Sequence, residues 1–326
     1  MIGRPGHRPP FSLLKRRSEL NVPSASVAPI SGSTADVGGE RERVQWVGYL
    51  FVSAFALPFV LFNILPVIFG TYVAFTEWNI FRSPEWVGTR NFRDAWSDEW
   101  VWIAFQNVIV YAVVIVPSVT VLALIFALYV NRGYPLSGLA RTLFFSPNVV
   151  SATVIGLVWV WMLDTNFGLI NYYLGFLGIS PISWLTSTTW SKFGVSIASI
   201  WWDLGLAFVL ILAALQDIPR DLLEAARVDG AGAFRRLRFV ILPHLRPVLS
   251  MVITLQLIST LRIFSQIYVM TSGAPAGSSS SPILYIYQTA ITRSLYGYAS
   301  ALSVILFVVI LSITLVQRVL FREVPQ

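Results

Sequence analysis

The sequence predicts an all-α integral membrane protein with six spanning helices and one further helix outside the membrane, between the fourth and fifth spans. Three observations support this fold class. Apolar residues make up 56% of the chain and charged residues 12%, whereas soluble domains carry about a quarter charged residues. Six apolar runs are about as long as a bilayer crossing requires. Lysine and arginine are distributed unevenly among the segments that join these runs.

The remaining composition excludes several kinds of protein. The chain has no cysteine and two histidines, so disulfides, thiolate catalysis and cysteine-ligated metals are excluded and a histidine-rich metal site is disfavoured. A net charge of +7 would favour a nucleic-acid partner for a soluble protein, but here the basic residues follow the loops between spans, so we predict none. Twelve tryptophans fit the aromatic belts of membrane interfaces. A soluble protein with one very large core is the disfavoured alternative.

Residues 1–45 differ from the rest of the chain. They contain Pro9-Pro10, the basic run Lys15-Arg16-Arg17 and a stretch rich in Ser, Gly, Ala and Pro. Such a segment cannot bury enough apolar surface to offset the entropy lost on ordering. We therefore predict a flexible basic tail over 1–45, not a cleaved signal peptide, and a transmembrane domain over 46–326.

Six apolar runs form the predicted spans. The first contains Pro58 and Pro66 and is longer than a straight crossing needs, so a tilt or kink is expected. Prolines inside spans remain compatible with helix because neighbouring helices can satisfy the freed backbone groups. The six ranges are Trp46–Thr76, Val101–Val130, Thr142–Leu163, Phe193–Gln216, Val248–Met270 and Ser300–Leu320.

The basic residues set the expected orientation. With the N-terminus placed inside, seventeen Lys and Arg residues fall on one side of the membrane and five on the other, and Arg262 lies inside the fifth predicted span. The positive-inside rule then places both termini in the cytoplasm, together with the loops after the second and fourth spans. Two termini on one side require an even number of spans, and six fits.

The loop after the fourth span, residues 217–247, carries the most informative motif. Pro219 lies near a helix start, and acidic Asp221 and Glu224 in its first turns complement the helix dipole. Small and apolar residues form one face, and Gly230 ends the helix where a turn is needed. A second, basic helix is predicted to follow and to stop at Pro243. A loop that merely obeys the positive-inside rule would explain the arginines, but it would not explain this pattern.

Glu224-Ala225-Ala226, followed by Asp229-Gly230-Ala231 and closed by Ile241-Leu242-Pro243, resembles the cytoplasmic loop signature of ABC importer permeases. The Asp-Gly-Ala form and two further segments resemble the carbohydrate-uptake, maltose-type branch. These segments are Phe167–Asn171, after the third span, and Ile267–Pro275, after the fifth. A departure is Ser265-Gln266, where many relatives have an acidic residue, and this leaves the local pore lining open.

The resemblance implies a role and a set of partners. The first helix of the loop would be the coupling helix that docks on a cytoplasmic ATPase, with Glu224 facing a basic group and Gly230 allowing the seating turn. A second similar permease, two ATPase copies, an extracytoplasmic solute-binding protein and a sugar are implied, in the cytoplasmic membrane of a bacterium. The residues implied for coupling are Glu224, Ala225, Ala226, Asp229, Gly230, Ala231, Leu242 and Pro243.

The chain is not predicted to be an enzyme. It contains no Gly-x-x-x-x-Gly-Lys-Ser/Thr loop to hold nucleotide phosphates. ATP and Mg²⁺ would therefore be used by the partner ATPase, and this chain would bind no cofactor of its own. The acidic residues Asp98, Glu99 and Asp164 are interpreted as solvated loop charges and not as catalytic groups.

Polar residues in the fourth and fifth spans form a candidate substrate pathway. Polar groups in a bilayer point toward protein or water, and a sugar needs hydroxyl partners together with a flat apolar surface. Hydrogen bonds that only hold the helices together are the alternative. In the fifth span the spacing places Gln256, Ser259, Thr260 and Ile263 on one helical face. The full set is Ser199, Trp202, Asp203, Gln256, Ser259, Thr260, Arg262 and Ile263.

Asp203 and Arg262 are the two candidate charges inside the membrane. Counted from the outer ends of their helices they lie at similar depths, at a rise of roughly 1.5 Å per residue. We hypothesise that they pair across the two helices, or that one of them meets a charged substrate, because either charge alone in lipid is costly.

Two other functions stay open at this stage. The first is an ABC importer permease for another solute class, such as glycerol-phosphate esters or peptides, and Arg262 keeps an anionic ligand in consideration. The second is a stand-alone ion-coupled carrier, which needs no coupling helix. The sequence does not specify which sugar or related solute is carried.

Overall fold

The structure is a computed structural model that describes residues 37–79, 81–133, 135 and 137–320. The predicted tail thus lies mostly outside the described residues, but α1 (Val37–Phe59) begins within its last part. The chain divides after Val60 into a first unit, represented by α1, and a second unit that contains the remaining elements.

The second unit is helical except for one small hairpin. Its elements in chain order are α2 (Leu65–Val73), β1 (Thr76–Asn79), β2 (Arg82–Trp86), α3 (Arg90–Ser97), α4 (Glu99–Asn131), α5 (Ser137–Val149), α6 (Ala152–Met162), α7 (Leu169–Phe176), α8 (Ser191–Gln216), α9 (Arg220–Val228), α10 (Ala233–Arg236), α11 (Leu242–Leu261), α12 (Ser265–Met270), α13 (Pro282–Tyr287) and α14 (Tyr296–Leu320). Three π-helical turns complete the helices: η1 (Val60–Ile64), which precedes α2, η2 (Leu237–Ile241) and η3 (Gln288–Thr292).

The membrane-length helices agree with the predicted number of spans. Within the described residues, five helices are long and apolar enough to cross a bilayer, and a bent pair supplies a sixth if it is counted as one span. The five are Gly48–Val73, Glu99–Asn131, Ser191–Gln216, Ala233–Leu261 and Tyr296–Val319, and the bent pair is α5 with α6.

The third predicted span is not one straight helix. α5 and α6 meet at an angle of 105°, across a break at Val150 and Ser151. Ser151 has an extended backbone, and its hydroxyl accepts a hydrogen bond from the backbone N–H of Val154, so it starts a new helix as an N-cap. Hydropathy alone could not place this break, because the residues on both sides are apolar.

The fifth predicted span differs from the structure at both ends. The expected stop of a helix at Pro243 is wrong, because one helix runs from Ala233 to Leu261. The π-helical turn η2 lies immediately before Pro243. A proline clashes with the carbonyl four residues earlier, and a wider turn there accommodates it. The helix then ends at Leu261 and not at Met270, so Arg262 lies just beyond the span.

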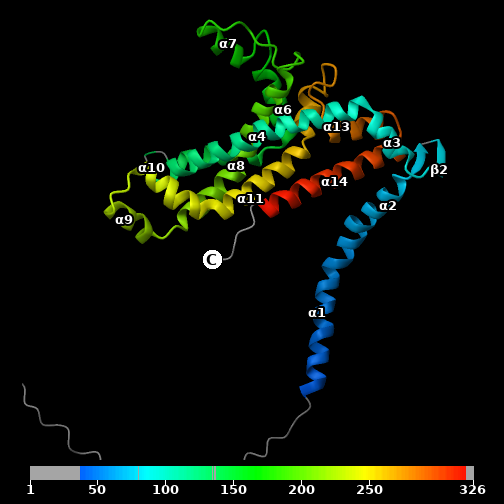
Figure 1. Cartoon of the computed structure of the whole chain (residues 1–326), viewed down its shortest axis with the longest axis horizontal. Coiled ribbons are helices and arrows are strands. Elements are labelled where there is room, and N and C mark those ends of the chain that lie inside the picture. Colours follow the sequence, from blue (N-terminus) through cyan, green and yellow to red (C-terminus); the bar gives the residue numbers. More distant parts are fainter. Residues whose placement is uncertain (1–36, 80, 134, 136, 321–326) are drawn as a thin grey trace, which may run out of the picture. The chain divides into compact units, whose positions relative to one another are not determined.

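Four helices form the main core. α4 packs along α8, and α5 and α11 each pack against both of them. Figure 1 shows α4, α8, α11 and α14 running side by side. Large core side chains come from α4 and α8, with small residues between them that let the backbones approach closely. The large side chains include Tyr111, Ile115, Phe208 and Ile211, and the small ones are Ala123, Ala127 and Ala198; all seven are fully buried.

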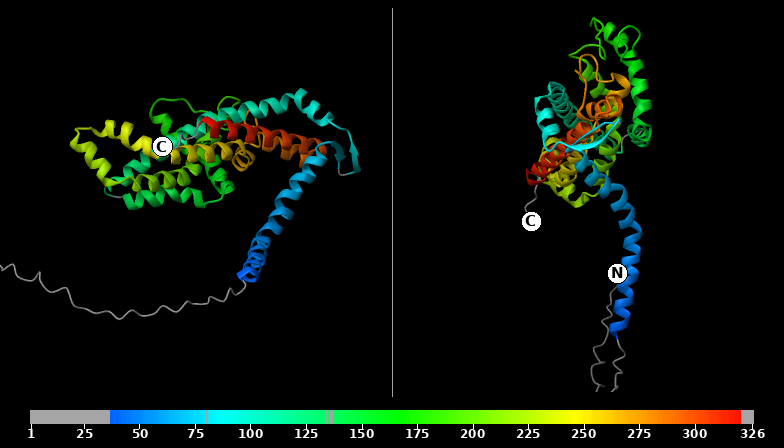
Figure 2. Two further views of the ribbon diagram at one scale, coloured as in Figure 1. Left: turned by 60° about the horizontal axis from the view of Figure 1, so that its bottom comes forward. Right: turned by 90° about the vertical axis from the view of Figure 1, so that its right-hand side faces the viewer.

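The two ends of this bundle carry different structures. α9 and α10 lie at one end, and the β1–β2 hairpin and α3 lie at the other, as Figures 1 and 2 show. The hairpin is antiparallel, with Thr76 opposite Trp86. It is an addition to the predicted all-α fold, too short to give a clear alternating pattern in the sequence.

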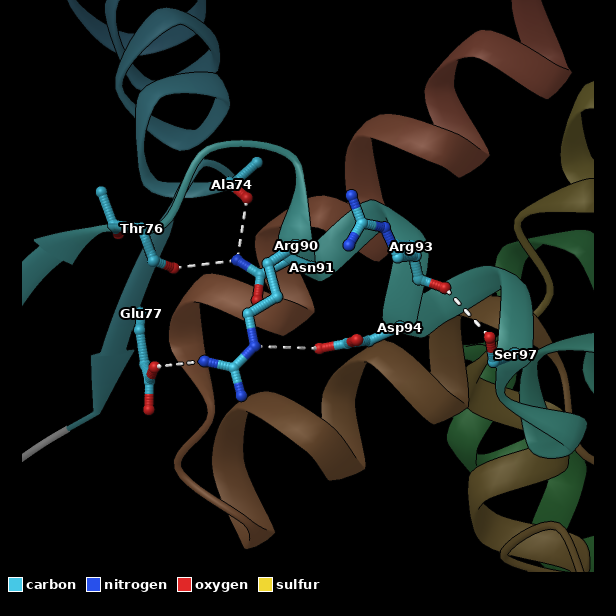
Figure 3. Close-up of polar contacts among 8 residues, drawn as sticks. All are labelled: Ala74, Thr76, Glu77, Arg90, Asn91, Arg93, Asp94 and Ser97. Carbon is cyan, nitrogen blue, oxygen red and sulfur yellow. Dashed lines mark hydrogen bonds and ion pairs between the residues drawn. The ribbon is translucent and has the colours of Figure 1, made fainter.

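A buried asparagine fixes the hairpin to α3 (Figure 3). The Asn91 amide Nδ2 donates hydrogen bonds of 2.9 Å to the carbonyl oxygens of Ala74 and Thr76. On the exposed side, Arg90 contacts Glu77 at 3.3 Å and Asp94 at 3.8 Å. Such exposed ion pairs contribute little to stability, so Asn91 is the main polar anchor between the hairpin and α3.

Candidate functional site

α9 is a short helix with well-defined ends. Pro219 precedes it as the N-cap residue, Asp221 lies in its first turn and Arg227 in its last, so both charges complement the helix dipole. At its C-terminus the N–H of Ala231 donates to the carbonyl of Ala226 at 2.9 Å, and the N–H of Gly230 donates to Arg227 at 3.0 Å. These two bonds form a Schellman motif, and they require the positive φ of 75° that Gly230 adopts.

Most side chains of α9 are exposed, although Leu223 packs against the main core. None of its residues is buried. Glu224 and Ala225 are exposed, Ala226 is half-buried, and Glu224 has no ion pair among the residues that the structure describes. Four large apolar side chains in and after α9 are exposed: Leu222, Val228, Phe234 and Phe239. Val228 is 88% exposed. Exposed apolar patches are typical of surfaces at which proteins associate.

The other residues predicted for coupling lie near α9 but differ in setting. Asp229 and Gly230 are exposed in the turn, and Ala231 is half-buried beside them. Leu242 and Pro243 occupy the first turn of α11, inside the continuous helix. They lie where this helix re-enters the bundle, and they do not end it.

A central pocket of about 400 Å³ opens among α4, α6, α8 and the corner between α11 and α12. Its walls combine aromatic, hydroxyl, amide and charged side chains, which is the mixture that small-molecule sites use to fix a ligand. The lining residues are Ile115, Ala152, Trp202, Asp203, Leu255, Ile258, Ser259, Thr260, Arg262, Ile263, Phe264, Ser265 and Gln266.

Six of the eight residues predicted for the substrate pathway line this pocket; Ser199 and Gln256 do not. The Ser199 hydroxyl donates to the carbonyl of Val195, one turn earlier. The Gln256 amide donates to the backbone carbonyl of Asp203 at 3.3 Å and joins α11 to α8. For Gln256 the structure thus shows the interhelical bond that was the alternative, whereas the Ser199 bond stays within α8. The six that line it are Trp202, Asp203, Ser259, Thr260, Arg262 and Ile263.

The hypothesised pair of charges is not formed. Asp203 and Arg262 line the same pocket, yet no ion pair within 4.0 Å joins them. The reason is the early end of α11, where Arg262 becomes the exposed C-cap residue while Asp203 stays half-buried on α8. The two side chains therefore form no ion pair, and the pairing hypothesis is wrong.

Trp202 links the pocket to the break between α5 and α6. Its indole Nε1 donates to the carbonyl of Val150 at 2.9 Å, and the Asn148 amide donates back to the carbonyl of Trp202 at 3.3 Å. Gly205 allows this close approach, since a Cβ there would lie 2.9 Å from the Cβ of Asn148. The sequence analysis missed Asn148 and Val150, because a broken span gives no hydropathy signal.

Loops at the end away from α9 are held by buried polar residues. The Asn107 amide on α4 donates to the carbonyls of Gly277 and Ser280, and the hydroxyl of Tyr111 donates to Ser279. These bonds clamp residues 271–281 against α4. Tyr285 donates to the carboxylate of Asp98 at 2.6 Å, and burial together with this bond raises the pKa of Tyr285.

A second anchored loop follows α6. The Asn171 side chain donates to three backbone carbonyls and accepts from the N–H of Ile182 and the indole of Trp184. Residue 171 was noted only as part of a family-like segment, and the structure gives it a physical role as the hub of residues 164–184. Within the described residues, no cluster of three or more His, Asp or Glu could hold a metal ion.

Comparison with known proteins identifies the family of this chain. Residues 119–325 match the family described as binding-protein-dependent transport system inner membrane component. The chain is 35% identical to the trehalose/maltose transport system permease protein MalF of Thermococcus litoralis, over 85% of this chain and 94% of that protein. It is 29% identical to the probable starch degradation products transport system permease protein AmyD of Thermoanaerobacterium thermosulfurigenes, over 84% and 94%.

A solved structure shares the fold. It is a chain of a bacterial alginate ABC transporter in complex with an alginate pentasaccharide-bound periplasmic protein, with a TM-score of 0.75 and 23% identity, over 88% of this chain and 97% of that chain. The family match covers more than half of the residues, and the relatives are matched along nearly their full length. The chain therefore belongs to the family of binding-protein-dependent transport system inner membrane components, and it is a permease subunit of an ABC importer and not the ATPase.

Proposed function

We propose that this chain forms one half of the translocation pathway of an ATP-driven sugar importer. The names of its relatives, which concern trehalose, maltose and starch products, support the sugar class. The distribution of basic residues supports an orientation with both termini and α9 in the cytoplasm. The hairpin, α3 and the anchored loops would then face the outside.

One observation carries the proposal: α9 is joined at both ends to the helices that line the central pocket. Trp202 and Asp203 lie on α8, which leads into α9, and Ser259 and Thr260 lie on α11, which follows from it. Buried Ile218 holds the junction of α8 and α9 in the core. A force applied to α9 can thus reach two pocket walls through short turns and the helices on either side, α8 and Ala233–Leu261.

The proposal implies four kinds of partner. The exposed surface of α9 would dock on a cytoplasmic ATPase, two copies of which would use ATP and Mg²⁺. Glu224 would contact a basic group there. A second, similar permease would complete the pathway, and an extracytoplasmic solute-binding protein would deliver the sugar. A periplasmic protein in the related alginate transporter supports this last partner.

The pocket has the chemistry that a sugar requires. The half-exposed ring of Trp202 and the ring of Phe264 offer flat apolar surfaces. Asp203, Ser259 and Thr260 offer hydrogen-bonding groups beside them. Closure of the ATPase dimer beneath α9 would re-tilt α8 and α11 and open this pocket to the other side of the membrane, which is the alternation that transport needs.

A co-purification experiment tests the proposal. The tagged chain is isolated from solubilised membranes as wild type, as Glu224→Lys and as Glu85→Lys, a charge-matched control on exposed β2 at the opposite end. We expect an ATPase and a second permease to accompany the wild type and the control. Glu224→Lys should lose the ATPase or its transport-coupled hydrolysis. Isolation of the wild-type chain alone, or an unchanged Glu224→Lys complex, would count against the proposal.

A further inference from the structure

The central pocket contains two opposite charges that do not touch each other. Asp203 lies on α8 and Arg262 at the C-terminus of α11, and no other charged residue lines the pocket. No hydrogen bond or ion pair within the described residues engages the Asp203 carboxylate; only its backbone carbonyl is used, by Gln256. A half-buried carboxylate without a protein partner can accept hydrogen bonds from a ligand that enters the pocket.

A second observation points to a ligand at the same place. Thr260 lines the pocket and is 2% exposed, and its buried hydroxyl has no hydrogen-bond partner. Buried hydroxyls are almost always hydrogen-bonded. Thr260 lies on the wall of α11 that also carries Ser259, and Trp202 provides a ring next to Asp203. Unpaired donors and acceptors therefore surround a flat apolar surface.

From this arrangement we infer that Asp203 and Arg262 are specificity determinants that sense the charge of the transported sugar and fix its direction. The inference rests on the proposed function and names the substrate class. Hydroxyl groups of a neutral sugar ring donate to the Asp203 carboxylate, and oxygen atoms at the other end accept from Arg262. A carboxylate next to Asp203 is repelled, so sugars that are acidic on every residue are excluded.

The two charges act in opposite directions on an acidic ligand. Loss of the Asp203 charge removes repulsion, whereas loss of the Arg262 charge removes attraction. A purely structural role for either residue would weaken neutral and acidic ligands alike. The informative quantity is therefore the ratio of the affinity for the neutral sugar to the affinity for the acidic sugar. Misfolding cannot raise this ratio in one variant and lower it in the other.

The experiment measures binding to the assembled complex of this chain, its second permease and the ATPase in lipid nanodiscs. The solute-binding protein is omitted so that the selectivity belongs to this pocket. Saturation-transfer NMR measures the affinities for the neutral sugars maltose, trehalose and lactose. An alginate disaccharide, acidic on both residues, is added as competitor to measure the affinity for an acidic sugar. The variants are Asp203→Asn and Arg262→Gln, with Glu85→Gln and Arg141→Gln as charge-matched controls away from the pocket.

We expect a neutral disaccharide to bind the wild type at least tenfold more tightly than the acidic one. Asp203→Asn should reduce this preference about tenfold, the effect of one lost charge contact of roughly 1.4 kcal/mol, and Arg262→Gln should increase it. Preference for the acidic sugar, or ratios that stay constant or shift together in the two variants, overturns the inference and leaves the importer proposal intact. No binding of any sugar, together with no ATP-dependent sugar uptake, overturns both.

Discussion

At the scale of single residues, Gly230 shows how one backbone conformation shapes the surface of α9. Its φ of 75° lies in the left-handed region, and it completes the Schellman motif that ends the helix. The neighbouring Gly232 has a φ of −62°, which any residue can adopt. Neither glycine is crowded by other atoms. The two positions therefore separate the effect of conformation from the effect of added bulk.

Substitution at these glycines gives the first prediction. Gly230→Ala should destabilise the end of α9 by about 1–2 kcal/mol, because a Cβ is strained in the left-handed region. We expect weaker coupling, measured as a lower ratio of sugar transported to ATP hydrolysed. Gly232→Ala should leave this ratio unchanged. Equal effects of both substitutions would show that added bulk matters at the docking surface and that the turn itself does not.

At the scale of elements, the contact between α5 and α8 controls the wall of the central pocket. Gly205 on α8 faces the backbone carbonyls of Phe144 and Phe145, each 3.2 Å from the position of a Cβ. The reciprocal bonds of Trp202 and Asn148 lie directly beside this contact. The position of α5, and with it the break before α6, depends on the absence of a side chain at Gly205.

A matched pair of glycine substitutions tests this contact. Gly205→Ala forces α5 away from α8 and should lower stability by about 1–3 kcal/mol, the usual effect of overpacking. Gly70→Ala, in α2 where no atom lies within 4 Å of the added methyl group, should leave stability unchanged or raise it by about 0.5–1 kcal/mol. Thermal unfolding in detergent measures both. A Gly205→Ala protein as stable as wild type would contradict the close packing.

Sequence patterns predicted these elements unevenly. Long apolar runs identified five helices because a bilayer demands length and apolarity. The break at Ser151, the π-helical turn before Pro243 and the end of α11 at Leu261 were missed. Each depends on local hydrogen bonds between residues of similar hydropathy. Polarity and helical spacing selected six residues that line one pocket, but the expected contact of Asp203 with Arg262 was wrong, because it assumed that α11 continues past Leu261.

At the scale of the whole molecule, the exposed surface of α9 lies at one end of the bundle and the anchored loops lie toward the other. The proposed function gives these ends opposite sides of the membrane. The chain has no cysteine, so single cysteines can report on each side without background. Val228, 88% exposed in α9, and Phe81, 91% exposed at the hairpin, are suitable positions.

The proposed orientation predicts the labelling of these positions. In intact spheroplasts, a membrane-impermeant maleimide should label Phe81→Cys and leave Val228→Cys unlabelled. Permeabilised membranes should allow labelling of both, which controls for reactivity. Labelling of Val228→Cys in intact spheroplasts would place α9 outside the cell and remove the proposed contact with a cytoplasmic ATPase.

The most direct test of the central claim is the energy source of transport. The complete complex, with its binding protein, is reconstituted in proteoliposomes, and uptake of radiolabelled maltose and trehalose is measured with ATP or a non-hydrolysable analogue on the ATPase side. The account predicts uptake that requires ATP hydrolysis and is lost when Glu224→Lys replaces the wild-type chain. Uptake driven by an ion gradient without ATP, or equal uptake with the Glu224→Lys chain, would contradict it.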